Sequence, residues 1–200
     1  ASIMPAPADA KPMRTPVVSF SSNGGSLSLS HNASSSAQAR MSKAQELLRS
    51  FEVDAAEITT LEKIGEGGQA HVVRGWWNGI EVAIKQPRPP REVRGKKDSD
   101  FASQSAMDSF SQAVRREVRA LSRVRHPNVI KLHGACFDPS PMVLMDFATS
   151  GTLQDALDEN KFQSPSEAVR LLAGVARGME AVHAHKIIHL DLKPENVLIG

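Results

Sequence analysis

The sequence predicts an α+β fold, because a stretch with strand patterns is followed by stretches with helical patterns. Between residues 58 and 85, short apolar runs are separated by turns that contain glycine. Residues 107–125 and 164–185 instead carry apolar residues at intervals of three and four, which is typical of amphipathic helices. The expected order along the chain is therefore strands, a helix, two further strands and then helices.

Composition excludes several classes of protein. The chain has 200 residues and a formal net charge of +2, which is too small to indicate nucleic-acid binding by itself. A hydrophobic share of 40% is enough to build a core. The single cysteine, Cys136, cannot form an internal disulfide, so a disulfide-stapled secreted scaffold is excluded. No run of 18 apolar residues occurs, so we expect no transmembrane segment.

Residues 1–44 differ in composition from the rest of the chain. They contain one acid, few large apolar residues and a serine-dense stretch over 19–36, so we expect a disordered tail or linker. The alternative is an organellar transit peptide, since such peptides are also rich in serine and poor in acids. The segment is not rich in arginine, so we favour a linker over a transit peptide and expect a cytoplasmic protein. The chain begins at Ala1 instead of a methionine, which indicates a fragment. A short helix capped by Ser42 is expected next.

A glycine-rich turn over residues 65–68 is the first motif with a chemical meaning. It follows a strand-like stretch with apolar residues that ends at Ile64, and a second strand is expected over residues 70–77. The dinucleotide-binding fold requires a helix directly after the glycines, so the expected strand excludes that fold. The turn is either an ordinary hairpin or a loop whose backbone N–H groups cover phosphates.

Residues 80–85 predict a third strand that ends in a lysine. Side chains alternate along a strand, so Val82 and Ile84 are expected on one face, and Ala83 and Lys85 on the other. The second face combines a small residue, which leaves room for a flat ring, with an ammonium group. A lysine at a strand end is usually a solvated charge, but its position 20 residues after Gly65 favours a functional role.

One glutamate lies on the apolar side of the helix expected over 107–125. The apolar stripe of that helix consists of Val114, Val118, Leu121 and Val124. Glu117 falls on this stripe, and an inward carboxylate is costly without a partner. Its partner is either a neighbouring arginine or Lys85, whose ammonium it would hold where phosphates bind.

The most specific motif follows a second helix, which the capping box at residues 164–167 opens and which is expected to end near His185. The apolar stripe expected for this helix is Ala168, Leu172, Val175, Met179 and Val182. Asp191, Lys193 and Asn196 then occur within six residues. They supply an acceptor for a hydroxyl proton, a cation for a phosphate and an amide oxygen for a metal.

These motifs, in this order and spacing, resemble those of eukaryotic protein kinases. The segments at residues 64–68, 74–79 and 126–136 are similar to the tyrosine-kinase-like group, such as the Raf-like and mixed-lineage kinases. The resemblance covers residues 51–200 and implies a protein-kinase-like fold with a partial kinase domain. The implied parts are a five-stranded antiparallel N-lobe with one helix over about residues 55–147, a hinge at 146–150 and an incomplete helical C-lobe at 151–200.

The resemblance also implies an activity and a set of functional residues. The activity is transfer of the ATP γ-phosphate to a Ser or Thr hydroxyl of a protein substrate, with ATP and Mg²⁺ as cofactors and without a nucleic-acid partner. The implied catalytic residues are Asp191, Lys193, Asn196, Lys85 and Glu117, and Asn196 is the implied metal ligand. The implied ATP contacts are Ile64, Gly65, Glu66, Gly67, Gly68, Val72, Ala83, Lys85, Met145, Asp146, Ala148 and Leu198.

The sequence departs from the family pattern at three points. Ala70 stands in place of the third glycine, Leu190 replaces the arginine beside the catalytic aspartate, and the chain ends at Gly200 before any Asp-Phe-Gly motif. We therefore expect the polypeptide as written to be marginally stable and catalytically inactive. The alternative function is a non-catalytic ATP-binding pseudokinase or scaffold module. A third is a basic interaction module centred on residues 85–97.

Overall fold

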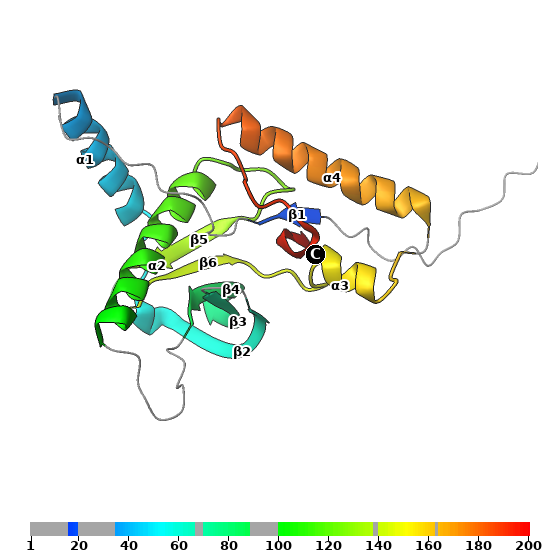
Figure 1. The fold of residues 1–200 in the computed structure, drawn as a ribbon, viewed down its shortest axis with the longest axis horizontal. Helices are drawn as coiled ribbons and strands as arrows, with labels where there is room; N and C mark the ends of the chain where they lie inside the picture. Colours follow the sequence, from blue (N-terminus) through cyan, green and yellow to red (C-terminus); the bar gives the residue numbers. More distant parts are fainter. Residues whose placement is uncertain (1–15, 20–34, 67–69, 89–99, 138–139, 163) are drawn as a thin grey trace, which may run out of the picture.

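The structure is a computed structural model that describes residues 16–19, 35–66, 70–88, 100–137, 140–162 and 164–200 (Figure 1). Its helices are α1 (Ser35–Arg49), η1 (Ala55–Glu57), α2 (Asp100–Leu121), α3 (Leu153–Asp158), α4 (Pro165–Ala184) and η2 (Pro194–Asn196). Its strands are β1 (Pro16–Val18), β2 (Ile58–Glu66), β3 (Ala70–Trp77), β4 (Ile80–Pro87), β5 (Leu132–Cys136), β6 (Met142–Asp146) and β7 (Val197–Ile199). None of the described helices is long and apolar enough to cross a bilayer.

Five of the strands form one antiparallel sheet in the order β2-β3-β4-β6-β5 (Figure 1). β3 has the limits expected from the sequence, and β4 begins at the expected residue and extends two residues further. Asn78 and Gly79 connect these two strands, and both have positive φ angles, as a tight hairpin turn requires. The sheet and the helices that accompany it confirm the predicted α+β fold class with a five-stranded antiparallel sheet.

The two faces of β4 contact different apolar clusters, as the alternation of its side chains predicts. Val82 and Ile84 are fully buried in a cluster on one face of the sheet. On the opposite face, the cluster that includes Val143 and Met145 of β6 packs against α2. The apolar stripe expected over residues 107–125 is buried: Val114, Val118, Leu121 and Val124 are each at most 4% exposed, although α2 begins earlier than expected and ends at Leu121, before Val124.

The helical part of the chain starts with two capped helices. Thr152 caps α3 in a reciprocal capping box with Asp155. Ser164 caps α4, and its hydroxyl accepts a hydrogen bond of 3.3 Å from the Glu167 N–H. Pro165 occupies the first helical position, where its missing N–H costs no hydrogen bond. α4 ends at Ala184 with His185 as its C-cap, close to the expected end.

The buried side of α4 differs from the expected stripe in part: Val175 and Val182 are buried as expected, but Gly174, Gly178 and Leu171 are buried as well. Leu172 is 58% exposed, whereas its neighbour Leu171 is buried. The helix presents Gly174 and Gly178 to its neighbours, and a Cβ at these positions would lie 2.4 Å from Pro16 and from the Asn128 carbonyl oxygen, respectively. Because the glycines allow this close approach, the packed face of α4 is rotated by about one residue position from the stripe that its apolar residues predict.

The expectation of disorder over residues 1–44 is corrected at two places, while most of this tail lies outside the described residues. Pro16–Val18 form β1, which pairs antiparallel with β7 (Figure 1). α1 begins at Ser35 instead of Ser42, because the intervening residues include alanine, glutamine and arginine, which favour helix. Leu48 near its C-terminal end is buried in the same cluster as the α2 stripe.

Candidate active site

The ammonium group of Lys85 and the carboxylate of Glu117 form a buried ion pair between β4 and α2. Lys85 Nζ lies 2.7 Å from Glu117 Oε2, and the two side chains are 10% and 4% exposed. The carboxylate therefore pairs with the strand lysine, which was one of the two partners expected. Glu117 Oε1 is buried and has no hydrogen-bond partner among the described residues. One oxygen of the pair is thus left to accept a further donor.

The register of the sheet places other residues that were expected to contact ATP beside Lys85. Val72 of β3 lies opposite Lys85, and Met145 of β6 lies opposite Ala83. Directly opposed residues of an antiparallel pair point to the same face. Four of the sequence-predicted residues therefore share the face of the sheet that carries the ammonium. Ala83 and Met145 are buried, and Val72 is half-buried.

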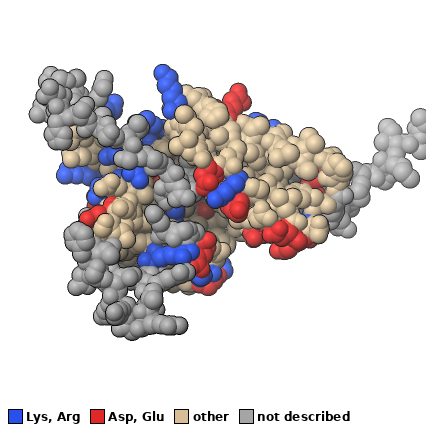
Figure 2. Space-filling model, in the orientation of Figure 1, with Lys and Arg blue, Asp and Glu red and all other residues tan. Residues whose placement is uncertain are grey.

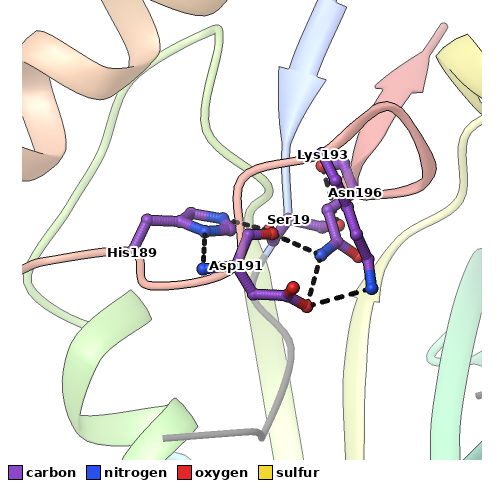
Figure 3. Close-up of polar contacts among 5 residues, drawn as sticks. All are labelled: Ser19, His189, Asp191, Lys193 and Asn196. Atoms are coloured by element: carbon purple, nitrogen blue, oxygen red, sulfur yellow. Dashed lines mark hydrogen bonds and ion pairs between the residues drawn. The ribbon is translucent and has the colours of Figure 1, made fainter.

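The loop before β7 forms a second polar cluster (Figure 3). The amide Nδ2 of Asn196 donates to the backbone carbonyl of Asp191 at 2.7 Å and to its carboxylate Oδ2 at 3.0 Å. Lys193 Nζ lies 3.4 Å from the same Oδ2. The three residues predicted from their spacing therefore meet at one carboxylate. Because Lys193 precedes a proline, its backbone is extended, and the short η2 helix that follows returns Asn196 towards Asp191.

His189 and Ser19 belong to this cluster, and the sequence analysis missed both. His189 is 5% exposed, and its Nε2 lies 2.5 Å from the backbone carbonyl oxygen of Ser19. Its Nδ1 accepts a hydrogen bond of 3.3 Å from the Asp191 N–H. A carbonyl can only accept and an N–H can only donate, so the ring is the neutral tautomer with its proton on Nε2. The signal for His189 was its position two residues before Asp191; nothing pointed to Ser19.

The glycine turn is described only in part. Gly67 and Gly68 lie outside the described residues. Gly65 is paired with Val72 in the sheet, and Ile64 is 43% exposed. Glu66 bonds to two cations: Lys63 Nζ lies 2.7 Å from one carboxylate oxygen, and Arg88 Nη2 lies 3.0 Å from the other. The second pair joins the turn to the segment that follows β4.

The remaining predicted contacts lie on the connection from β6 to α3 and on β7. Asp146 accepts a hydrogen bond of 2.6 Å from His133 Nε2, and its backbone N–H donates to the Lys131 carbonyl at 3.1 Å. Ala148 and Leu198 are half-buried. A cavity of about 400 Å³ lies elsewhere, against Val17 of β1 and the segment between α2 and β5, and it includes Asp146 but none of the other predicted nucleotide contacts.

The donor set of the loop before β7 fits a magnesium ion and a phosphate. Both hydrogen bonds of the Asn196 side chain come from Nδ2, so neither of them uses its amide oxygen, the atom that would bind the metal. Mg²⁺ is usually held in proteins by one or two carboxylate or carbonyl oxygens together with substrate phosphates. Among the described residues no group of three or more His, Cys, Asp or Glu forms a cage that would hold a metal alone. The arrangement therefore suits an ion that arrives with its phosphates.

Surface charge on the face drawn in Figure 2 is mixed. Lysine and arginine side chains alternate there with aspartate and glutamate over the described part of the chain. Most of the basic segment considered in the sequence analysis, residues 89–97, lies outside the described residues. Arg88, at its start, is engaged with Glu66. The described surface thus gives no support to a basic interaction module.

Comparison with known proteins gives a family match. The family model described as protein kinase domain matches residues 58–200. Mitogen-activated protein kinase kinase kinase 13-B of Xenopus laevis is 34% identical over 150 residues, which are 74% of this chain and 13% of that protein. Mitogen-activated protein kinase kinase kinase 12 of Rattus norvegicus is 35% identical over 74% of this chain and 14% of that protein.

A more distant relative carries a different specificity in its name. The dual specificity protein kinase pyk3 of Dictyostelium discoideum is 30% identical over 162 residues, which are 80% of this chain and 11% of that protein. The chain spans 13%, 14% and 11% of these three relatives, so each of them extends far beyond the matched region.

Proposed function

The chain belongs to the protein kinase family, and we propose that the protein containing it transfers the γ-phosphate of ATP to a serine or threonine hydroxyl of a protein substrate. The observation that carries this proposal is the presence of two polar clusters of complementary chemistry. One is the buried Lys85–Glu117 pair on the sheet, and the other is the Asp191, Lys193 and Asn196 group before β7.

The proposed roles follow from the geometry of these clusters. Lys85 binds the α- and β-phosphates, because Glu117 holds its ammonium on the face that also presents Ala83 and Met145 to the adenine. Asp191 accepts the proton of the substrate hydroxyl while the oxygen of that hydroxyl forms the new bond to the γ-phosphorus. The bond between the γ-phosphorus and the bridging oxygen breaks, and ADP leaves with that oxygen.

The cations have distinct tasks in this proposal. Lys193, beside the carboxylate of Asp191, steadies the transferred phosphate. The amide oxygen of Asn196 binds Mg²⁺, which when bound neutralises charge on the phosphate oxygens. The preference for Ser and Thr rests on the lysine two residues after Asp191, which is typical of serine/threonine kinases, and on the relatives named as mitogen-activated protein kinase kinase kinases.

Nucleotide binding is the first test, and this chain suffices for it. Isothermal titration with Mg²⁺-ATP is expected to give binding that is lost in Lys85→Met and kept in Lys43→Met, which removes an exposed lysine of α1. Circular dichroism of both variants reports whether they are folded. If the folded Lys85→Met variant binds ATP as tightly as the parent chain, the role proposed for Lys85 is wrong.

Phosphotransfer is the second test, and it requires the full-length protein. Radiolabel from γ-labelled ATP is expected to reach a generic protein substrate, and phosphoamino-acid analysis is expected to find it on serine and threonine. Asp191→Asn is expected to lower the rate by about 10²- to 10⁴-fold, as loss of a general base does. ATP binding with no transfer above the Asp191→Asn background would instead support the pseudokinase or scaffold alternative.

A further inference from the structure

We propose that Arg74 is a positioning residue for the connection from β6 to α3, because its guanidinium group holds the ring of Phe147. The inference rests on the proposed function, since Phe147 lies directly between Asp146 and Ala148, two of the implied ATP contacts. The carbon Cζ of Arg74 lies 5.3 Å from the centroid of the Phe147 ring. A guanidinium group within about 6 Å of a ring centroid is attracted by the electrons of that ring. A contact that fixes Phe147 also restricts the backbone on either side of it.

The register of the sheet places Arg74 on the face that carries the implied nucleotide contacts. Arg74 of β3 lies opposite Ala83 of β4, and Ala83 lies opposite Met145 of β6. Directly opposed residues of an antiparallel pair point to the same face, so the side chain of Arg74 shares the face of Lys85. β6 leads directly into Phe147 and then towards α3 (Figure 1). The ring at the start of this connection therefore lies within reach of the guanidinium group.

Two carboxylates orient the guanidinium group of Arg74. Its Nε and Nη2 atoms both contact Oε1 of Glu81, and its Nη1 donates to Oε1 of Glu62 at 3.1 Å. Glu81 belongs to β4 and Glu62 to β2, so the group is held from the strands on both sides of β3. A guanidinium group is planar and its N–H groups have fixed directions, so bonds to two carboxylates restrict its orientation. The cation is thus fixed before it meets the ring.

The connection is hydrogen-bonded at its two ends. The Asp146 N–H donates to the segment before β5 at 3.1 Å, and the Ser150 N–H donates to β7 at 3.0 Å. Among the described residues, no hydrogen bond reaches the backbone of residues 147–149. The stack with Arg74 therefore restrains the middle of the connection, which its hydrogen bonds leave unsupported.

The expected effect of this restraint is on the edge of the adenine ring. The resemblance to protein kinases implies that the backbones of Asp146 and Ala148 hydrogen-bond to that edge. A backbone that is held in one conformation before binding loses less freedom when the ligand arrives, so pre-organisation raises affinity. Arg74 is therefore expected to favour nucleotides that carry the exocyclic amino group of adenine, without contacting the nucleotide itself.

The first test measures the order of the connection in the full chain without any nucleotide. ¹⁵N relaxation of the parent chain is expected to give an order parameter of about 0.85 for the Ala148 amide, which is typical of rigid backbone. In Arg74→Leu this value is expected to fall below about 0.6. The matched control is Arg115→Leu, because Arg115 Cζ lies 4.6 Å from the Phe137 ring centroid and the variant removes a stack of the same kind elsewhere. The control is expected to leave the Ala148 amide as ordered as in the parent.

A folded Arg74→Leu variant in which the Ala148 amide stays as ordered as in the parent overturns the inference, and so does a parent chain in which this amide is already flexible. Circular dichroism reports whether the variant is folded. If it is not, Phe147→Leu replaces it, because that substitution removes the ring and leaves the ion pairs of Arg74 with Glu81 and Glu62 in place. The same loss of order is expected in Phe147→Leu, and its absence overturns the inference.

The second test asks whether Arg74 acts through the edge of the adenine. Isothermal titration compares Mg²⁺-ATP with the Mg²⁺ complex of purine riboside triphosphate, which lacks the exocyclic amino group. The preference for ATP is expected to fall by about 2- to 5-fold in Arg74→Leu, as the loss of an exposed cation–π contact predicts, and to stay unchanged in Arg115→Leu. Equal weakening of both nucleotides, or no weakening of either, overturns the positioning role.

The outcomes separate this inference from the proposed function. A parent chain that binds neither nucleotide contradicts the nucleotide-binding part of the proposed function. The order parameter of the Ala148 amide is measured without nucleotide, so it supports or overturns the hold of Arg74 on the connection in that case as well.

Discussion

Lys85 and Glu117 are joined inside the protein by a single contact of 2.7 Å between Nζ and Oε2, with both side chains at most 10% exposed. The contact connects the third strand of the sheet to α2, and the second carboxylate oxygen is buried without a partner among the described residues. A buried ion pair of this kind is costly to form and more costly to break, because removal of one partner leaves the other charge without compensation.

Lys85→Met is therefore expected to lower the free energy of unfolding by about 3–5 kcal/mol. The double variant Lys85→Met/Glu117→Leu is expected to recover most of this loss, since it removes both charges and fills the same space. Urea denaturation followed by circular dichroism measures both values. A double variant that is as unstable as the sum of the two single variants would show that the sites are not coupled.

Gly178→Ala is expected to destabilise the protein by about 1–3 kcal/mol, although alanine is the better helix former. A Cβ at this position would lie 2.4 Å from the Asn128 carbonyl oxygen, a backbone atom that cannot move aside without moving the segment before β5. The counterpart is Ala176→Gly on the exposed side of α4, which is expected to lose only the helix propensity of about 1 kcal/mol. Gly178→Ala with unchanged or increased stability in the same urea assay would contradict the close packing.

Leu190→Gly is expected to leave stability unchanged or to raise it by up to about 1 kcal/mol. Leu190 has φ of 66°, a region that branched and bulky residues rarely adopt, and its side chain is 72% exposed, so little packing is lost. Leu192→Gly is the control, because Leu192 is not among the residues with positive φ. The free energy of unfolding of this variant is expected to fall by about 0.5–1 kcal/mol through backbone entropy alone. Equal losses in thermal unfolding of the two variants would contradict backbone strain at Leu190.

Thr152→Ala is expected to cost about 1 kcal/mol at neutral pH, as the loss of a helix cap does. The backbone N–H and the hydroxyl of Thr152 donate to the carboxylate of Asp155 and hold the pKa of Asp155 below its ordinary value. A depressed pKa stabilises the fold at pH values above the ordinary pKa, and that contribution is lost as the pH falls through the folded value. The stability gap between parent and variant is therefore expected to narrow in acid.

The carboxyl carbon of Asp155 is the direct probe of this coupling. Its NMR titration is expected to show a midpoint below the ordinary aspartate pKa in the parent chain and a shift back towards that value in Thr152→Ala. An unchanged midpoint would mean that the hydroxyl of Thr152 does not contribute to the charge on Asp155.

Local patterns predicted most of the sheet and both polar clusters. The limits of β3, the faces of β4 and the inward position of Glu117 follow from side-chain periodicity, which reports burial directly. Asp191, Lys193 and Asn196 were found because six residues of sequence bring them together. In each case the information lies in side chains that are close along the chain.

The features that sequence reasoning missed depend on backbone atoms or on absent atoms. Ser19 reaches His189 through a carbonyl that every residue possesses, so no residue type signals the contact. The packed face of α4 is set by Gly174 and Gly178, which an apolar count ignores. The strand Pro16–Val18 is too short to show alternation and lies in a tail whose composition indicates disorder.

The pairing of Pro16 with Ile199 has a consequence for synthesis on the ribosome. β1 is made early, but 178 residues lie between it and its antiparallel partner β7. At a translation rate of about 5–20 residues per second, the β1 edge waits roughly 10–40 s for β7. All strands of the five-stranded sheet are synthesised before β7, so the loop that carries Asp191 can pair with β1 only after the residues of that sheet have been made.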